Sequence, residues 1–188
     1  MIKSKVDYLY YLESDKKSLG ISRKKPRIAK DEIWKFQRLL RKVEYFKNCK
    51  RGLNKLYLYY LLYKKNKMEV DLGFTIPPNV FGPGLAICHR GTIVVNHMAK
   101  VGKNCRIHTC VNIGFQAGTS NAPIIGDNVY IGPGAKLFGD IKIANGIAIG
   151  ANSIVNKSFS EENITIAGIP AKKINNRGSN GLLTKGAI

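Results

Sequence analysis

The sequence predicts a mainly β protein in which short strands wind into a three-sided coil, preceded by α-helices. The main observation is an apolar residue at every sixth position from Val101 to Val155, with a single exception. A second row of mostly apolar residues runs two positions ahead, and Gly or Ala often follows the first row. A period of six fits neither an α-helix nor one long strand, but it is typical of the hexapeptide-repeat β-helix, whose interior these rows would fill.

The two rows define the predicted core of the coil. The first row consists of Val101, Ile107, Ile113, Ile125, Ile131, Leu137, Ile143, Ile149 and Val155. The second row consists of Ala99, Cys105, Val111, Val129, Ala135, Ile141, Ile147 and Ser153. The first row is interrupted at Thr119, inside the polar stretch 115–124. This stretch is predicted to be a loop that projects from the coil, and such loops often carry function.

Three helices are predicted before the coil. Ser4 can cap a first helix that runs to about Lys17 and ends before Gly20. Asp31 begins a second helix, whose apolar residues recur at spacings of three and four. A third helix is expected over residues 53–67, although the segment LYLYYLLY within it also fits a strand. The resulting division is a basic, aromatic-rich helical segment over residues 1–70, the coil with its loop over 71–174, and a loose tail over 175–188.

Charge is concentrated in the predicted helical segment. The chain of 188 residues has a formal net charge of +19, and residues 1–67 hold 20 of the Lys and Arg but only 6 of the acids, a balance of 20 − 6 = +14. We expect its aromatic side chains to pack against the coil, with a weak contact to an anionic membrane surface in addition. Neither a secretory signal, a membrane span nor a nucleic-acid-binding motif is found, so we expect no nucleic-acid partner and a cytoplasmic location, peripheral at the inner membrane face. The four cysteines form no CxxC pair. We therefore expect them to act as small buried apolar side chains in a reducing compartment, rather than as zinc ligands or disulfides.

The three histidines are the candidate catalytic groups. Counting back by six from Val101 gives Val95 and then His89, so a perfect register places His89 in the apolar interior. A register slip at Gly91 would instead turn the ring outward as a general base, and the periodicity leaves both alternatives open. His97 and His108 are expected at solvated corners. Because the spacings of the three histidines are not multiples of six, they do not stack, and no metal site is predicted.

Five segments match one known family. They are GLAICHRGTIVVN, CRIHTCVNIG, PIIGDNVYIGPGAKLFGDIKI, AIGANSIVNKSF and TIAGIPAKKI, all within residues 76–174. This region resembles the acetyl-CoA-dependent acyltransferases of the left-handed β-helix class, most closely the serine acetyltransferase branch. The resemblance implies acetyl-CoA as co-substrate, a homotrimer, and active sites between neighbouring coils of different subunits.

The resemblance also implies roles for individual residues. His89 matches the catalytic base, and Gly114 falls in the turn that approaches the reacting thioester. The segments that line the coenzyme A groove match Gly132, Gly134, Ala135, Lys136, Gly150, Ala167, Gly168, Pro170, Lys172 and Lys173. The candidate acceptor-binding residues are Cys88, Arg90, Asn112, Gln116 and Asn121.

Three departures concern the amino-acid acceptor. Cys88 stands where the serine enzymes carry Asp before the catalytic His, Phe74 replaces a second carboxylate, and Asn121-Ala122 replaces an Arg-His pair. Each lost charge-assisted hydrogen bond is worth about 1.5–3 kcal/mol. The sequence therefore favours O-acetylation of a sugar hydroxyl, on a surface polysaccharide or its precursor, as in the serine acetyltransferase-like proteins. The alternatives are serine O-acetylation in cysteine biosynthesis, with a rebuilt acceptor pocket, and a non-catalytic basic scaffold that binds an anionic surface.

Overall fold

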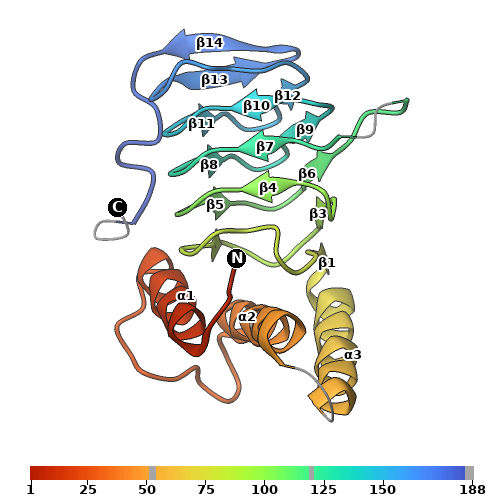
Figure 1. The fold of residues 1–188 in the computed structure, drawn as a ribbon. Coiled ribbons are helices and arrows are strands. Elements are labelled where there is room, and N and C mark those ends of the chain that lie inside the picture. Colours follow the sequence, from red (N-terminus) through yellow and green to blue (C-terminus); the bar gives the residue numbers. More distant parts are fainter. Residues whose placement is uncertain (51–53, 119–120, 185–188) are drawn as a thin grey trace.

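The protein is a coil of short strands that stands on three helices (Figure 1). The computed structural model describes residues 1–50, 54–118 and 121–184; the interruption predicted at Thr119 and the predicted start of the third helix at residue 53 lie outside them. The helices are α1 (Lys5–Ser18), α2 (Glu32–Cys49) and α3 (Asn54–Leu72). Ser4 is the N-cap of α1, and its hydroxyl accepts a hydrogen bond from the backbone N–H of Asp7 at 3.0 Å.

Helix α3 continues beyond its predicted end at Lys67, through to Leu72. Its last turns are held in place by side-chain contacts with its own residues and with the coil. Glu69 accepts hydrogen bonds from the ammonium group of Lys65 at 2.5 Å and from the backbone N–H of Ile76 at 2.9 Å. Leu72 is buried in the core. These tertiary contacts extend the helix to the first strand of the coil.

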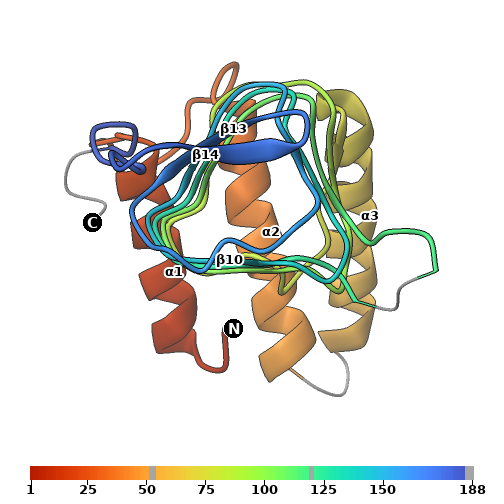
Figure 2. The same ribbon diagram turned by 90° about the horizontal axis from the view of Figure 1, so that it is seen from above.

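The strands form three sheets, one on each side of the coil (Figure 2). Side A consists of β1 (Phe74–Thr75), β3 (Ile93–Val95), β6 (Val111–Gly114), β9 (Lys136–Phe138) and β12 (Ile154–Val155). Side B consists of β4 (Lys100–Val101), β7 (Ile124–Ile125) and β10 (Lys142–Ile143). Side C consists of β2 (Ala86–Ile87), β5 (Arg106–Ile107), β8 (Tyr130–Ile131), β11 (Ala148–Ile149), β13 (Thr165–Gly168) and β14 (Ala171–Asn175). Every pair of strands is parallel except the final hairpin β13–β14, so the predicted left-handed β-helix is confirmed.

Both predicted rows fill the interior of the coil. Every residue of the two rows is at most 5 % exposed, and Ile107, Ile131 and Ile149 are completely buried. Burying one such aliphatic side chain contributes about 1.5–3 kcal/mol. The stacked rows therefore supply the main stabilisation of a coil whose individual strands are only two to five residues long.

A buried charge network joins the helices to the first turn of the coil. The guanidinium of Arg41 on α2 contacts Asp15 at 2.8 Å and Glu44 at 3.0 Å, and it donates hydrogen bonds to the carbonyl oxygens of Phe81 and Gly82. The carboxylate of Asp15 also accepts hydrogen bonds from two backbone N–H groups of the coil, those of Gly84 and Leu85. The network thus supplies hydrogen-bond partners to backbone carbonyl and N–H groups at the end of the coil, where no further strand pairs with them.

The C-terminal segment packs against the molecule as far as Thr184, so the prediction of a loose tail is wrong for these residues. The Ser179 hydroxyl donates to the carbonyl of Asn128, and the Thr184 hydroxyl donates to the carbonyl of Ser18, each at 2.7 Å. Leu183 is buried. Residues 185–188 of the predicted tail lie outside the described residues. Within the described part of the chain, no helix is long and apolar enough to cross a membrane.

Candidate functional site

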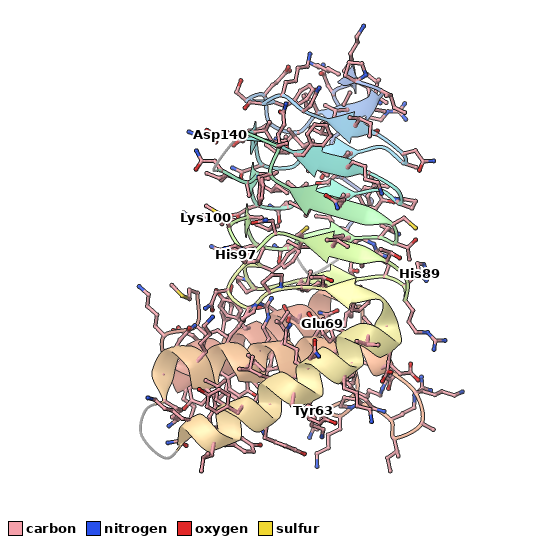
Figure 3. All side chains as sticks on the ribbon, turned by 90° about the vertical axis from the view of Figure 1, so that its right-hand side faces the viewer. Tyr63, Glu69, His89, His97, Lys100 and Asp140 are labelled. Carbon is pink, nitrogen blue, oxygen red and sulfur yellow. The ribbon has the colours of Figure 1, made fainter. Side chains whose placement is uncertain are left out.

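His89 lies exposed at the corner between β2 and β3, outside the interior of the coil. The register explains why. Ile87 pairs with Ile107, 20 positions later (107 − 87), whereas Ile131 pairs with Ile149, 18 positions later (149 − 131). The corner after Ile87 therefore holds two extra residues, and Gly91 within it adopts a φ of 125°. Of the two alternatives left by the periodicity, the structure has the one in which the ring points outward (Figure 3).

His89 faces a small cluster on side C of the coil. The ring centroids of His89 and His108 are 6.1 Å apart, and those of His108 and Tyr130 are 5.1 Å apart. The thiol sulfur of Cys88 lies 3.5 Å from Nε2 of His108. His108 is half-buried, so the expectation of a solvated ring is wrong. The pairing of Ile87 with Ile107 places it beside Cys88, whereas a regular turn of the coil would have placed it beside Arg90.

The environment of this cluster favours its neutral forms. Burial lowers the pKa of His108, and the positive charge of Arg106 lowers it further. Burial raises the pKa of the Cys88 thiol, although Arg106 acts in the opposite direction. Cys88 therefore remains a neutral thiol near neutral pH, and it does not supply the negative charge of the Asp that it replaces.

Helix α2 fixes the strand that leads into this corner. The side chain of Gln37 donates to the carbonyl of Leu85 at 2.6 Å and accepts from the N–H of Ile87 at 3.2 Å. Gln37 is completely buried. Because Ile87 is followed directly by Cys88 and His89, these two hydrogen bonds position the exposed histidine.

Several predicted coenzyme-binding residues continue along the same corner of the coil. The inward-facing isoleucines of the side C strands, at positions 87, 107, 131, 149 and 166, are stacked in register. The residue that follows each of these isoleucines therefore stacks on its neighbours as well. The resulting column consists of Cys88, His108, Gly132, Gly150 and Ala167. At Gly132 a Cβ atom would lie 2.8 Å from the carbonyl oxygen of Ile149, so the stacking itself requires glycine there.

The remaining coenzyme-groove residues lie near this column or at the end of the coil. Gly134 lies in the corner between sides C and A; Lys136 begins β9, and its ammonium group donates to the carbonyl of Cys110. Ala135 is completely buried, so its side chain faces the core and is not available to a ligand. The residues of the final hairpin and its turn are Gly168, Pro170, Lys172 and Lys173. Lys173 forms an ion pair with Glu161, while Lys172 is exposed.

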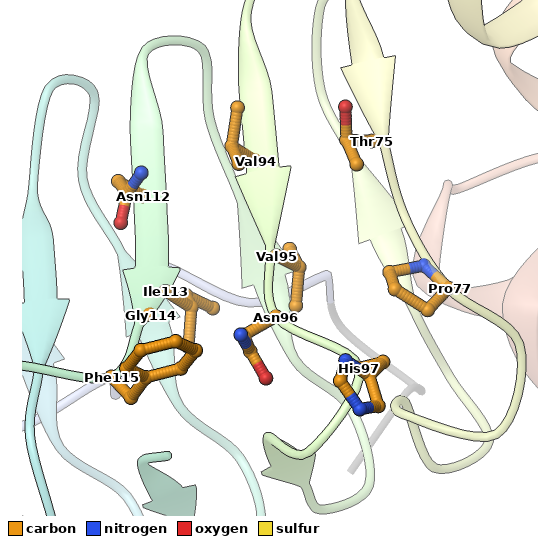
Figure 4. Close-up of a pocket in the computed structure, with 10 residues that line it drawn as sticks. All are labelled: Thr75, Pro77, Val94, Val95, Asn96, His97, Asn112, Ile113, Gly114 and Phe115. Carbon is orange, nitrogen blue, oxygen red and sulfur yellow. The ribbon is translucent and has the colours of Figure 1, made fainter. Parts of the chain in front are cut away.

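Gly114 lies at the opposite edge of side A from His89. β3 and β6 are parallel, and Val95 pairs with Ile113, so Gly114 lies near His97 at the end of these strands. These residues, together with Asn112, line an open pocket of about 420 Å³ (Figure 4). Figure 3 shows His89 and His97 at opposite edges of the sheet. One chain therefore does not bring His89 and Gly114 together.

The other acceptor candidates are also spread over the surface. Arg90 is exposed beside His89, whereas Gln116 and Asn121 lie on the loop that projects from the coil in Figure 2. The amide of Asn121 donates to the carboxylate of Asp140 at 3.0 Å. Only Arg90 and Cys88 of the five candidates belong to the His89 corner.

Two of the positions that lack the expected charges, Phe74 and Ala122, are buried in the core. The ring of Phe74 packs edge-on against Phe36, with centroids 5.2 Å apart, and Ala122 is also buried. Neither can contact an acceptor with a charged group. Within residues 1–50, 54–118 and 121–184, no group of three or more His, Cys, Asp or Glu side chains could hold a metal ion.

Sequence comparison finds serine acetyltransferases. The chain is 38% identical over 104 residues to the serine acetyltransferase of Staphylococcus aureus (strain N315), covering 52% of this chain and 47% of that protein. It is 35% identical over 100 residues to the enzyme of Mycobacterium tuberculosis (strain ATCC 25618 / H37Rv), covering 52% and 43%. The chain thus spans less than half the length of these curated relatives. No family model matches.

Structure comparison extends the similarity into the helices. The serine acetyltransferase of Brucella abortus strain S19 superposes with a TM-score of 0.72 at 25% identity, covering 93% of this chain and 71% of that one. The Neisseria gonorrhoeae enzyme in complex with serine gives 0.70 at 26% identity, covering 91% and 70%.

These findings correct the predicted acceptor. The prediction of sugar O-acetylation in polysaccharide biosynthesis is wrong, because the proteins that the chain matches are serine acetyltransferases. The chain is similar to serine acetyltransferases in fold over nearly its whole length and in sequence over about half of it.

Proposed function

We propose that the protein transfers the acetyl group of acetyl-CoA to the hydroxyl of serine, the step of cysteine biosynthesis that forms O-acetylserine. The observation that carries the proposal is the exposed His89, at a corner whose sequence resembles the segment with the catalytic histidine of serine acetyltransferases, the proteins that the chain matches over about 100 residues. The two-residue slip after Ile87 serves no purpose for packing, because Ile87 and Ile93 fill the same interior positions as Ile107 and Val111 in the next turn, which lacks the slip. It does turn a potential general base toward solvent and substrates.

In this mechanism His89 accepts the proton of the serine hydroxyl as the oxygen attacks the thioester carbonyl. A backbone N–H near Gly114 donates a hydrogen bond to the oxyanion that develops. A positioned base typically contributes about 10²–10⁴-fold in rate, and an oxyanion donor about 10²–10³-fold. Collapse of this oxyanion breaks the C–S bond of the thioester, and His89 returns its proton to the departing thiolate, so that O-acetylserine and coenzyme A are formed.

The residues of the glycine-rich corner fit a coenzyme. Gly132 and Gly150 leave a surface without protruding side chains along the column that begins at Cys88, and the exposed ammonium group of Lys172 lies at its far end. A long pantetheine arm needs such a smooth surface, and a nucleotide phosphate needs a cation. A structure of the Brucella abortus enzyme with coenzyme A shares the fold, with a TM-score of 0.73.

The active form in this proposal is a homotrimer with sites between chains. His89 and Gly114 lie at opposite edges of side A in one chain. They can act on one acetyl group only if the second residue comes from a neighbouring copy. Residues 115–118 of that copy, which follow Gly114 directly, would then lie near His89.

The helical segment supports a weaker proposal, a contact with anionic lipid. Trp34 and Phe36 are buried, in keeping with aromatic packing, but Tyr59 and Tyr63 on α3 are 68% and 67% exposed. Exposed tyrosines beside lysines are suited to a headgroup interface.

A coupled assay of coenzyme A release tests the acetyl-transfer proposal. We expect release that depends on L-serine and that His89→Ala abolishes, while Glu13→Ala, a change of an exposed residue on α1, retains most of it. A protein that releases coenzyme A with oligosaccharides but not with L-serine would refute the proposal.

A further inference from the structure

A pocket of about 200 Å³ lies between the start of α2 and the end of β2. The residues that matter here are Asp31, the N-cap of α2, Glu32 and Trp34 from α2, and Cys88 from the coil. We call it the α2 pocket. Its lining residue Cys88 directly precedes the candidate base His89 in the chain, and the pocket is large enough for a small amino acid.

The pocket carries one carboxylate that the protein does not neutralise. Asp31 is already engaged, since Arg23 contacts it at 2.6 Å and the backbone N–H of Arg27 donates to it at 2.8 Å. Glu32, in contrast, forms no ion pair or side-chain hydrogen bond within the described part of the chain. A ligand ammonium group is the natural partner for such a carboxylate.

The pocket also presents donors for an anion. The first N–H groups of a helix have no partner within it, and the side chain of the N-cap residue Asp31 makes no capping hydrogen bond. The indole N–H of Trp34 is buried without a hydrogen-bond partner, and the side chain is 2% exposed. A buried donor without a partner costs free energy, which a ligand acceptor in the pocket would recover.

We propose that the α2 pocket is the subsite for the zwitterionic head of the amino-acid acceptor. Glu32 takes the ammonium group, and the first turn of α2 together with the indole N–H of Trp34 takes the carboxylate. This inference rests on the proposed transfer to serine. In this proposal, groups of α2 take the place of the charges that are missing at Phe74, Cys88 and Ala122, and Glu32 is a specificity-determining residue.

Trp34 provides a direct probe because it is the single tryptophan of the chain. Its fluorescence, excited where tyrosine does not absorb, is followed in the full-length protein during titration with L-serine. We expect a saturable change, weakened at least about 10-fold by Glu32→Gln and largely retained by Glu32→Asp. Glu13→Gln, which removes an exposed carboxylate on α1, is the matched control and should leave the affinity unchanged.

Two analogues separate a charge contact from a general loss of structure. Ethanolamine keeps the ammonium group, and 3-hydroxypropionate keeps the carboxylate. Glu32→Gln should weaken the binding of ethanolamine but not that of 3-hydroxypropionate, whereas a misfolded variant would lose both.

The outcomes distinguish this inference from the proposed function. Normal turnover of L-serine without any response of Trp34, or with unchanged KM in Glu32→Gln, would overturn the α2 pocket and leave the function standing. Glu32-dependent binding of L-serine without turnover would support the pocket and refute the function. Failure of both binding and turnover would overturn both.

Discussion

Replacing Arg41 by Met should destabilise the protein strongly and in a pH-dependent way. The substitution keeps the length of the side chain but removes the only positive charge that contacts Asp15 and Glu44 within the described residues. Both carboxylates are at most 3% exposed, and two coil carbonyls, of Phe81 and Gly82, also lose their donor. Water cannot replace the lost contacts without opening the joint between helices and coil.

The magnitude follows from the burial of the charges. Removing one partner of a buried ion pair typically costs about 3–5 kcal/mol. For a chain of this size, each kcal/mol corresponds to about 2–4 °C in Tm, so we expect a fall of roughly 6–20 °C. Arg38→Met on the same helix, which removes only a cation–π contact with Trp34, should cost no more than about 1 kcal/mol.

The pH dependence has a definite sign. Burial raises the pKa of Asp15, and Arg41 opposes that rise. A carboxyl whose pKa is higher in the folded than in the unfolded state contributes stability at low pH and loses it as the pH rises through the folded pKa. Without Arg41 this loss should grow, so the deficit of Arg41→Met should be larger at about pH 7.5 than at about pH 5.

Thermal unfolding of wild type, Arg41→Met and Arg38→Met is compared at the two pH values and one protein concentration. A loss for Arg41→Met no larger than that for Arg38→Met would refute the argument. A deficit that does not change with pH would show that the carboxylates do not titrate as inferred.

Three further predictions concern activity and assembly. His89→Ala should lower kcat at least about 10²-fold with little change in coenzyme A affinity, and near-normal turnover would exclude His89 as the base. Light scattering should give the mass of three chains of 20.9 kDa at micromolar concentration, and an active monomer would contradict the site between chains. The protein should co-sediment with anionic but not neutral vesicles and be released by about 0.5 M salt, because exposed charges are then screened; equal binding to both vesicle types would refute this.

The coil could be predicted from the sequence because its core depends on a repeating pattern alone. The same pattern leaves the position of His89 open between two alternatives, because the two extra residues after Ile87 preserve an apolar spacing of six. Ile87 and Ile93 are themselves six apart, so they look like members of one row, although Ile87 pairs with Ile107 and Ile93 with Val111. Only the pairing between turns of the coil reveals the slip.

The acceptor prediction failed for a related physical reason. The absence of charge at Phe74, Cys88 and Ala122 was identified correctly, and two of these positions are buried. The inference to a neutral sugar assumed that an amino acid must be held by those same positions. Helix α2, far earlier in the chain, places Glu32 and Trp34 against the coil. The pocket joins residues that are distant in sequence, since Ile33 and Cys88 are 55 positions apart (88 − 33), and no sequence pattern indicates which residues of a helix will line such a pocket.

Helix α2 therefore connects the stability of the fold with the geometry of the candidate site. Arg41 and Gln37 lie one turn apart on this helix, and both hold the first turn of the coil. Arg41 donates to the carbonyls of Phe81 and Gly82. Gln37 bonds the carbonyl of Leu85 and the N–H of Ile87. The first turn of the same helix forms a wall of the pocket beside His89. A rotation or shift of α2 would move the base and the pocket wall relative to each other. The buried polar contacts prevent this because a displaced Arg41 or Gln37 would leave several buried groups without partners, at a cost of about 1–3 kcal/mol each.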